Sequence, residues 1–173
     1  NFVFKGNVPG GAGMSSSAAL ENSVVFGLNE VFNLGLSKEE MIFISQKAEH
    51  NYAGVNCGIM DQYASMFGKK NHALLLDCRI VKARPFKIDF KNHQLLLINT
   101  NVKHSLSDSA YNDRRSACEH ISKLLKVKAL RDITEEDLSF IKEEVSPENY
   151  QKALYVIQEN IRAIKASKAM END

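Results

Sequence analysis

The sequence predicts an α+β fold. Three observations support this prediction. An alternating apolar–polar stretch opens the chain, helical periodicity follows as far as residue 67, and a cluster of strand-like stretches then precedes a second helical region. With 173 residues, 44% of them hydrophobic and 25% charged, the chain is long enough for one domain or for parts of two.

The first half of the chain is predicted to be one strand followed by three helices. Residues 1–8 alternate like a strand, and residues 15–32 carry apolar side chains at helical spacing. Ser37 and Glu40 have the spacing of a capping box, which predicts a second helix. A loop precedes a short third helix at residues 59–67.

The second half is predicted to be three strands followed by helices. Residues past Ser107 return to helical spacing, and a short helix is expected in "ITEEDLSFI". Ser146 and Pro147 are favoured as the cap and the first residue of a final helix. The three strand-like stretches are residues 72–77, 80–90 and 93–99.

Composition excludes several classes of partner. Lys plus Arg number 22 and Asp plus Glu 21, a balance that gives no reason to expect nucleic acid or an anionic membrane. The three cysteines are dispersed, which favours a reduced, cytoplasmic protein over a zinc site. No apolar run approaches the roughly 18 residues of a membrane span.

The stretch "PGGAGMSSSAALE" (residues 9–21) is typical of an anion-binding loop. Gly11 and Gly13 allow the backbone to approach a ligand, and the first amides of the following helix have no internal partner. The pattern is not a Walker loop, which needs a lysine, and it lacks the third glycine of a dinucleotide fingerprint. The alternative is a tight turn whose serines cap the helix.

Three further residues have two interpretations each. Asp61 follows the glycine-containing loop "GVNCG" and is either a general base or a helix cap. Glu49 lies near the end of its helix, where a carboxylate opposes the dipole, and is either a metal ligand or a surface charge. Tyr111 either contacts a ligand or packs in the core.

Taken together, the motifs resemble those of galactokinases, in the GHMP small-molecule kinase superfamily. The stretches "VPGGAGMSSSAALE", "QKAEH", "GVNCGIMDQYAS", "LLLDCR", "NVKHSLSDSAYNDRRSACE" and "VIQENIR" occur in the family's order and spacing across nearly the whole chain. "CGIMDQ" followed by "YNDRR" is specific to galactokinases. The resemblance implies a two-domain α+β fold and a cytoplasmic, Mg²⁺-requiring enzyme that phosphorylates galactose at O1 with ATP.

The resemblance also implies a role for each site residue. Ser17 and Glu49 would contact Mg²⁺, and Asp61 would be the catalytic base facing the anomeric hydroxyl. Gly58 and Tyr111, with Asp61, would contact galactose. Residues 1–91 would belong to the family's N-terminal domain and residues 92–173 to its C-terminal domain. The ATP phosphates would lie on Gly11, Ala12, Gly13, Met14, Ser15, Ser16 and Ser17.

The chain departs from the family pattern at both ends. Galactokinases begin with a sugar-binding GRxNxxGEHxDY stretch and end with a GGGFGG-type stretch, and this sequence contains neither. We therefore expect the middle of a galactokinase, inactive alone and able to associate through an unpaired edge of its N-terminal strand. Two alternatives are a galactokinase-like sensor that binds ATP and galactose without turnover, and a kinase for N-acetylgalactosamine or arabinose. The intact "GMSSSAALE" loop and Asp61 favour the enzyme.

Overall fold

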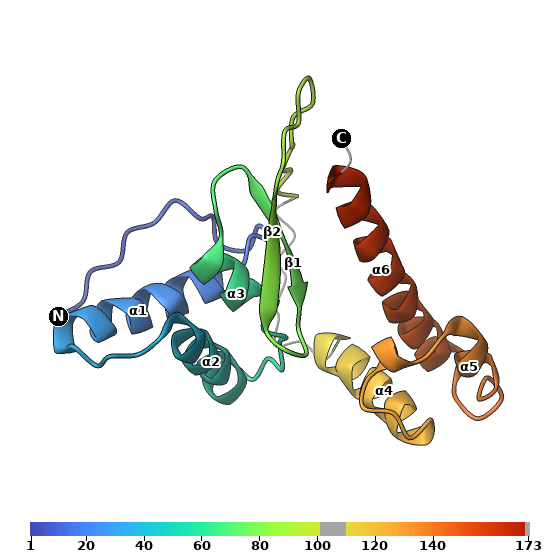
Figure 1. Ribbon diagram of the computed structural model, residues 1–173. Helices are drawn as coiled ribbons and strands as arrows, with labels where there is room; N and C mark the ends of the chain where they lie inside the picture. The colour runs from blue at the N-terminus through green and yellow to red at the C-terminus, as the bar shows by residue number, and fades with distance from the viewer. Residues whose placement is uncertain (101–109, 172–173) are drawn as a thin grey trace. The chain divides into compact units, whose positions relative to one another are not determined.

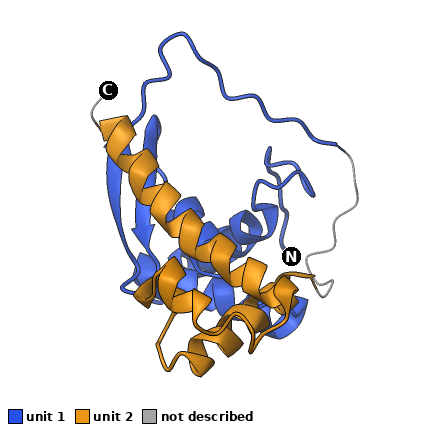
Figure 2. Cartoon of the chain, turned by 90° about the vertical axis from the view of Figure 1, so that its right-hand side faces the viewer, with its two compact units in different colours: residues 1–106 blue, residues 107–173 orange. Residues whose placement is uncertain are grey.

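The chain combines helices with one small antiparallel sheet, which confirms the predicted α+β class (Figure 1). The computed structural model describes residues 1–100 and 110–171. Part of the motif "NVKHSLSDSAYNDRR" therefore lies outside the described residues, as does the predicted helix start at Ser107. The chain divides into two compact units, Asn1–Leu106 and Ser107–Asp173 (Figure 2).

The first unit is built on helices that contact one another. α1 packs against both α2 and α3, and α2 also packs against α3. Helix α2 begins with the predicted capping box. Ser37 Oγ accepts a hydrogen bond from the Glu40 amide, and the Glu40 carboxylate accepts one from the Ser37 amide. A π-helical turn, which periodicity did not predict, continues α2 directly. The elements are α1 (Ser16–Phe32), α2 (Lys38–Ala48), the π-helix η1 (Glu49–Ala53) and α3 (Met60–Phe67).

A two-stranded antiparallel sheet follows α3. β1 (His72–Asp77) pairs with β2 (Lys82–Lys87), with His72 opposite Lys87 and Asp77 opposite Lys82. Tyr63 of α3 joins the helix to this sheet, because its hydroxyl oxygen accepts a hydrogen bond from the Ala83 amide at 3.2 Å. The core of the unit contains Ile42, Ile59 and Tyr63, with partly buried side chains from both strands packed against them.

Two of the predicted strands are not present. Within residues 1–100 and 110–171, β1 and β2 form the only sheet, and residues 1–8 and 93–99 are not strands. Strand β2 is also shorter than the predicted 80–90. An alternating apolar–polar sequence indicates that a segment suits a half-buried surface. The segment forms a strand only where a neighbouring strand makes hydrogen bonds with its backbone. Neither segment has such a neighbour among the described residues, so the predicted strand edge at residues 1–8 is wrong.

The second unit is helical and has its own core. Its elements are α4 (Ala110–Leu124), the 3₁₀ turn η2 (Leu130–Asp132), α5 (Glu135–Ser139) and α6 (Pro147–Glu171). The Asn149 amide donates to Ser146 Oγ at 3.2 Å, which confirms the predicted cap of α6. The buried core residues are Ile121, Leu130, Leu138, Ile141, Ala153 and Ile157.

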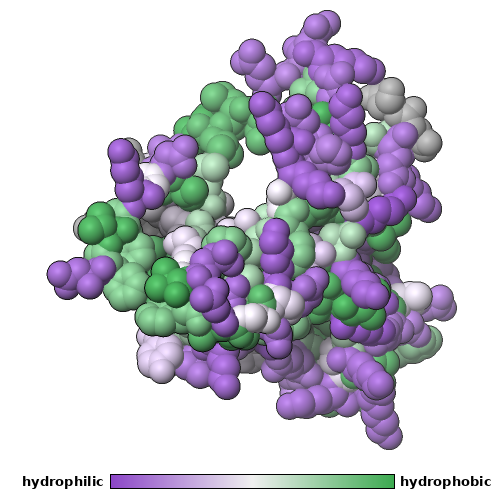
Figure 3. Space-filling view, turned by 60° about the vertical axis from the view of Figure 1, so that its left-hand side comes forward, coloured by the Kyte–Doolittle hydropathy of each residue, from purple (hydrophilic) through white to green (hydrophobic). Residues whose placement is uncertain are grey.

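Many large apolar side chains are exposed. Hydrophobic atoms occupy much of the face shown in Figure 3. Val3 is 93% exposed and Leu96 is 77% exposed, and both lie in the segments predicted as strands. No helix among the described residues combines the length and apolarity needed to cross a membrane. The domain boundary at residue 91 concerns the family's domains and stays a prediction.

Candidate active site

The glycine–serine loop reaches helix α1 through alternating left-handed residues. Gly11 and Gly13 each have φ +70°, and Ser15, the N-cap of α1, has φ 53°. Backbones that alternate in this way can turn successive N–H groups toward a common anion. The Ser15 side chain makes no capping hydrogen bond, and the first turn of α1 contains no acidic residue. The alternative of a serine-capped turn is therefore wrong for Ser15, and the positive end of α1 is not neutralised by a side chain.

Glu49 is buried at the junction between α2 and η1. Its side chain is only 5% exposed, which excludes the surface-charge interpretation. Its Oε2 atom is buried and has no hydrogen-bond partner among the described residues. A buried carboxylate oxygen without a partner is costly and is a common sign of an interaction with an ion or a ligand. The carboxylate thus has one oxygen available for such a contact.

Glu21, on α1, faces Glu49. Burial, a hydrogen bond with Glu49 and the negative charge of Glu49 raise the pKa of Glu21 from 4.5 to about 7. Glu21 lies four positions after Ser17, so the two residues occupy the same face of α1. The effect of Glu49 on Glu21 is thus felt on the face of α1 that also carries Ser17.

Asp61 lies in the first turn of α3. The N-cap position of α3 is Ile59, which makes no side-chain capping bond, so Asp61 is not the cap residue. Burial raises the pKa of the Cys57 thiol, a hydrogen bond from Gln62 opposes this, and the charges of Glu49, Glu21 and Asp61 raise it further. The carboxyl groups of three separate helical elements therefore all act on the charge state of this one thiol.

Buried amides connect the helices that carry these carboxyl groups. Asn22 Nδ2 on α1 donates to the main-chain oxygen of Gln62 on α3 at 2.9 Å. Gln62 Nε2 lies 3.5 Å from Glu21 Oε2 and 3.8 Å from Cys57 Sγ. Gln62 is 1% exposed. These bonds fix α1 and α3 relative to each other and hold Asp61, the neighbour of Gln62, in place.

The remaining predicted site residues are Gly58 and Tyr111. Gly58 is exposed in the loop between η1 and α3, one residue after Cys57. Tyr111 lies in the first turn of α4, in the second unit, and is 42% exposed. Among the described residues, no group of three or more His, Cys, Asp or Glu side chains is arranged to hold a metal ion.

Sequence reasoning missed Glu21, Asn22 and Gln62. Glu21 had a usable signal, because its spacing from Ser17 places both on one helix face. The sequence contained no signal for Asn22 and Gln62, because their role in joining α1 to α3 depends on a contact between residues 40 positions apart.

Comparisons with known proteins find relatives along nearly the whole chain. The model of the GHMP kinases N terminal domain matches residues 1–69. The galactokinase of Clostridium beijerinckii is 41% identical over 176 residues, which cover 99% of this chain and 45% of that protein. The galactokinase of Thermotoga petrophila is 41% identical over 165 residues, covering 95% of this chain and 46% of that protein. The chain thus spans slightly less than half the length of these curated relatives.

A solved structure extends the agreement to the fold. The crystal structure of Lactococcus lactis galactokinase complexed with galactose matches with a TM-score of 0.86 and 32% sequence identity. The match covers 96% of this chain and 44% of that one. By sequence and by fold, the chain is similar to slightly less than half of a galactokinase, and its residues 1–69 match the N-terminal domain of the GHMP kinases.

Proposed function

We propose that the full-length protein transfers the γ-phosphoryl group of ATP to O1 of galactose. The observation that carries the proposal is the buried carboxylate of Glu49, whose Oε2 atom has no hydrogen-bond partner among the described residues. The glycine–serine loop, with its left-handed glycines and the uncapped start of α1, supports it. Phosphoryl transfer requires mainly alignment of the reactants and neutralisation of charge. The 41% identity to galactokinases supports the choice of galactose.

The loop residues Gly11–Ser17 bind the triphosphate in this proposal. Their left-handed glycines direct backbone N–H groups to the anion, and the uncapped start of α1 adds the positive end of its dipole. No lysine is needed, because these groups supply the positive potential. The Ser15, Ser16 and Ser17 hydroxyls are half-buried and can donate further hydrogen bonds to phosphate oxygens.

Mg²⁺ is the ion that the family implies, and the residues present fit it. Glu49 Oε2 is a buried oxygen without a partner among the described residues, and Mg²⁺ prefers oxygen ligands. Glu49 and Ser17 would hold the ion, with the ATP phosphates completing its coordination. When bound, Mg²⁺ supplies positive charge that neutralises the phosphates.

Asp61 acts as the general base. Its carboxylate accepts the proton of the O1 hydroxyl while O1 bonds to the γ-phosphorus and the bond to the ADP oxygen breaks. Gly58 and Tyr111 contact the sugar in this proposal. None of the three cysteines forms a disulfide bond, which is compatible with the proposed cytoplasmic location.

The test is product formation by the full-length protein. Galactose with Mg²⁺ and ATP should give galactose 1-phosphate, detected by ³¹P NMR, and one ADP per sugar. N-acetylgalactosamine and arabinose serve as competing substrates. Binding of ATP and galactose without ADP release would instead identify a sensor, and faster turnover of another sugar would correct the substrate.

A further inference from the structure

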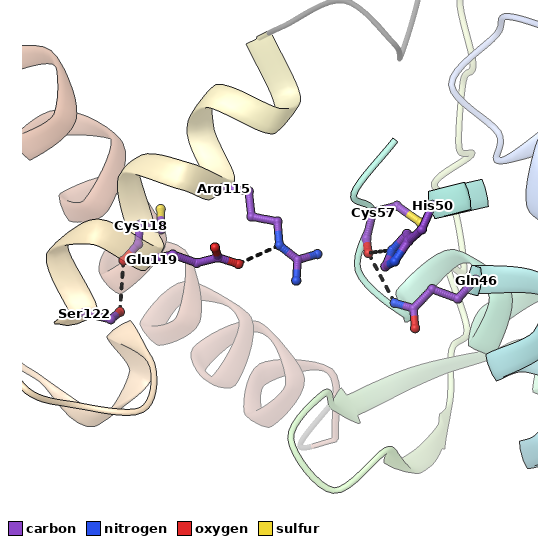
Figure 4. A network of polar contacts seen from close by, with 7 residues as sticks. All are labelled: Gln46, His50, Cys57, Arg115, Cys118, Glu119 and Ser122. Atoms are coloured by element: carbon purple, nitrogen blue, oxygen red, sulfur yellow. Dashed lines mark hydrogen bonds and ion pairs between the residues drawn. The ribbon is translucent and has the colours of Figure 1, made fainter. Parts of the chain in front are cut away.

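The loop between η1 and α3 is fixed at one main-chain oxygen. The carbonyl oxygen of Cys57 lies 2.9 Å from His50 Nε2 and accepts a hydrogen bond from Gln46 Nε2 at 3.2 Å (Figure 4). A carbonyl oxygen has two lone pairs, so these two bonds use its full accepting capacity. Because a carbonyl cannot donate, the His50 ring is bonded here with its proton on Nε2.

Both donors come from one helical segment. Gln46 lies in α2 and His50 in the π-helical turn that continues it, four positions apart. π-helical turns are rare and occur often at functional sites, where the wider turn changes the direction of the side chains. Here the same turn contains Glu49, the proposed Mg²⁺ contact.

Buried side chains and a main-chain hydrogen bond also hold the loop on either side of this carbonyl. Val55 and Ile59 are buried at either side of Cys57, being 3% and 5% exposed. The Cys57 amide bonds to the Val55 carbonyl at 2.8 Å. The Cys57 carbonyl is followed directly by Gly58, which is exposed and has no Cβ to hold its backbone in one conformation.

We propose that Gln46 and His50 are positioning residues for the sugar site. By holding the Cys57 carbonyl they fix the backbone of Gly58 and the start of α3, where Asp61 lies. This inference rests on the proposed function, because it takes Gly58 as a galactose contact and Asp61 as the base. In this proposal the two residues act through the Cys57 carbonyl and not on a substrate, so the proposed roles of the phosphate loop do not depend on them.

Two variants of the full-length protein test the proposal. Gln46→Glu keeps the size of the side chain but presents an oxygen that cannot donate at neutral pH, and His50→Phe keeps a ring without a donor. Each variant should raise the galactose KM about 3- to 10-fold, the effect expected for the loss of one neutral hydrogen bond. The ATP KM should stay within about twofold. His50→Gln, which retains an N–H donor, should recover part of the galactose affinity.

Hydrogen exchange, measured by mass spectrometry without substrates, gives a second readout. Both variants should speed exchange in peptides covering residues 54–60 and leave β1 and β2 unchanged. His72→Phe is the matched control, because His72 Nδ1 lies 2.8 Å from the Lys70 carbonyl at an exposed position away from the loop. It should change neither exchange at residues 54–60 nor the galactose KM.

Unchanged exchange at residues 54–60 in both variants would overturn the proposal, as would equal rises in the KM for ATP and for galactose. If the His50→Phe variant does not fold, the results for Gln46→Glu decide the test. A wild-type protein that neither binds nor phosphorylates galactose refutes the proposed function instead. The exchange measurement then still decides whether Gln46 and His50 hold the loop.

Discussion

Glu21 is partly buried beside Glu49, so it keeps its proton to a higher pH than an ordinary glutamic acid, with a pKa raised from 4.5 to about 7. The proton is retained because burial and the neighbouring charge disfavour ionisation of Glu21. The pair makes the site sensitive to pH and provides a residue-scale test of the cluster that does not depend on catalysis.

We expect Glu21 to make the folded protein less stable as pH rises. The folded pKa of about 7 exceeds the ordinary value of 4.5. Its contribution to stability is therefore full below pH 4.5 and is lost as pH rises through about 7. Urea unfolding of the full-length wild type and of Glu21→Gln, in EDTA, should show the wild type losing stability relative to the variant between pH 5 and pH 8. A constant difference between the two proteins would contradict the pairing.

Gly13 should be required for its backbone conformation. It has φ +70°, while an added Cβ would meet no atom within 4 Å, so the cost of Gly13→Ala comes from the left-handed backbone alone. That cost is about 1–2 kcal/mol. If the loop flattens to avoid it, the ATP KM of the full-length enzyme should rise about tenfold.

Gly10→Ala is the matched control for this loop. Gly10 also has open space around it but does not have a positive φ. Its ATP KM should stay close to that of the wild type. Equal effects of the two substitutions would refute the role given to the left-handed backbone.

At the scale of single elements, helix α2 carries Gln46 and leads into the turn with Glu49 and His50. Its start depends on the capping box of Ser37 and Glu40. Ser37→Ala should lower the free energy of unfolding by about 1 kcal/mol, measured by urea denaturation. Glu39→Gln is the control, because Glu39 lies in the same turn outside the box.

The capping box also predicts a pH dependence. Hydrogen bonds from the Ser37 amide and then from the Ser37 hydroxyl lower the pKa of Glu40. The stabilisation by ionised Glu40 is present above the ordinary pKa of 4.5 and is lost as pH falls through the lowered value. The cost of Ser37→Ala should accordingly shrink in acid. A cost that grows below pH 4 would contradict this account.

Elements governed by local chemistry were predictable from sequence. The caps at Ser37 and Ser146 and the short helix α3 follow from neighbouring residues, and the structure confirms them. The predictions of strands at residues 1–8 and 93–99 were wrong, because strand pairing depends on segments that are distant in the sequence. For the site, Glu49 and Asp61 carried sequence signals, while the bonds from Gln46 and His50 depend on how the chain folds back at Cys57.

At the scale of the whole molecule, exposed apolar side chains occur along the chain and include runs in the two segments without strand partners. Phe2, Val3 and Phe4 are exposed in one segment, and the other exposes the run Leu95, Leu96, Leu97 and Ile98. Apolar surface of this extent favours association. We expect association through these side chains rather than through the edge of a sheet.

Residues 1–173 expressed alone should therefore associate and should not phosphorylate galactose. The chain spans less than half of its relatives' length, and the arginine-bearing motif expected near the transferred phosphate is not in this sequence. Loss of a positioned cation at such a site costs about 10³–10⁵ in rate. Light scattering and an ADP-release assay on a mass-verified sample measure both properties. Monomeric behaviour or robust turnover would contradict the expectation.

The most direct test of the central claim is Asp61→Asn in the full-length protein. We expect kcat to fall by about 10²–10⁴, because the amide cannot accept the O1 proton, while galactose binding measured by calorimetry is largely kept. Asp89→Asn is the control, because the Asp89 carboxylate accepts from the Lys91 amide at an exposed turn. A large loss of kcat with retained binding in Asp61→Asn alone is the predicted result. Turnover close to that of the wild type would contradict the account.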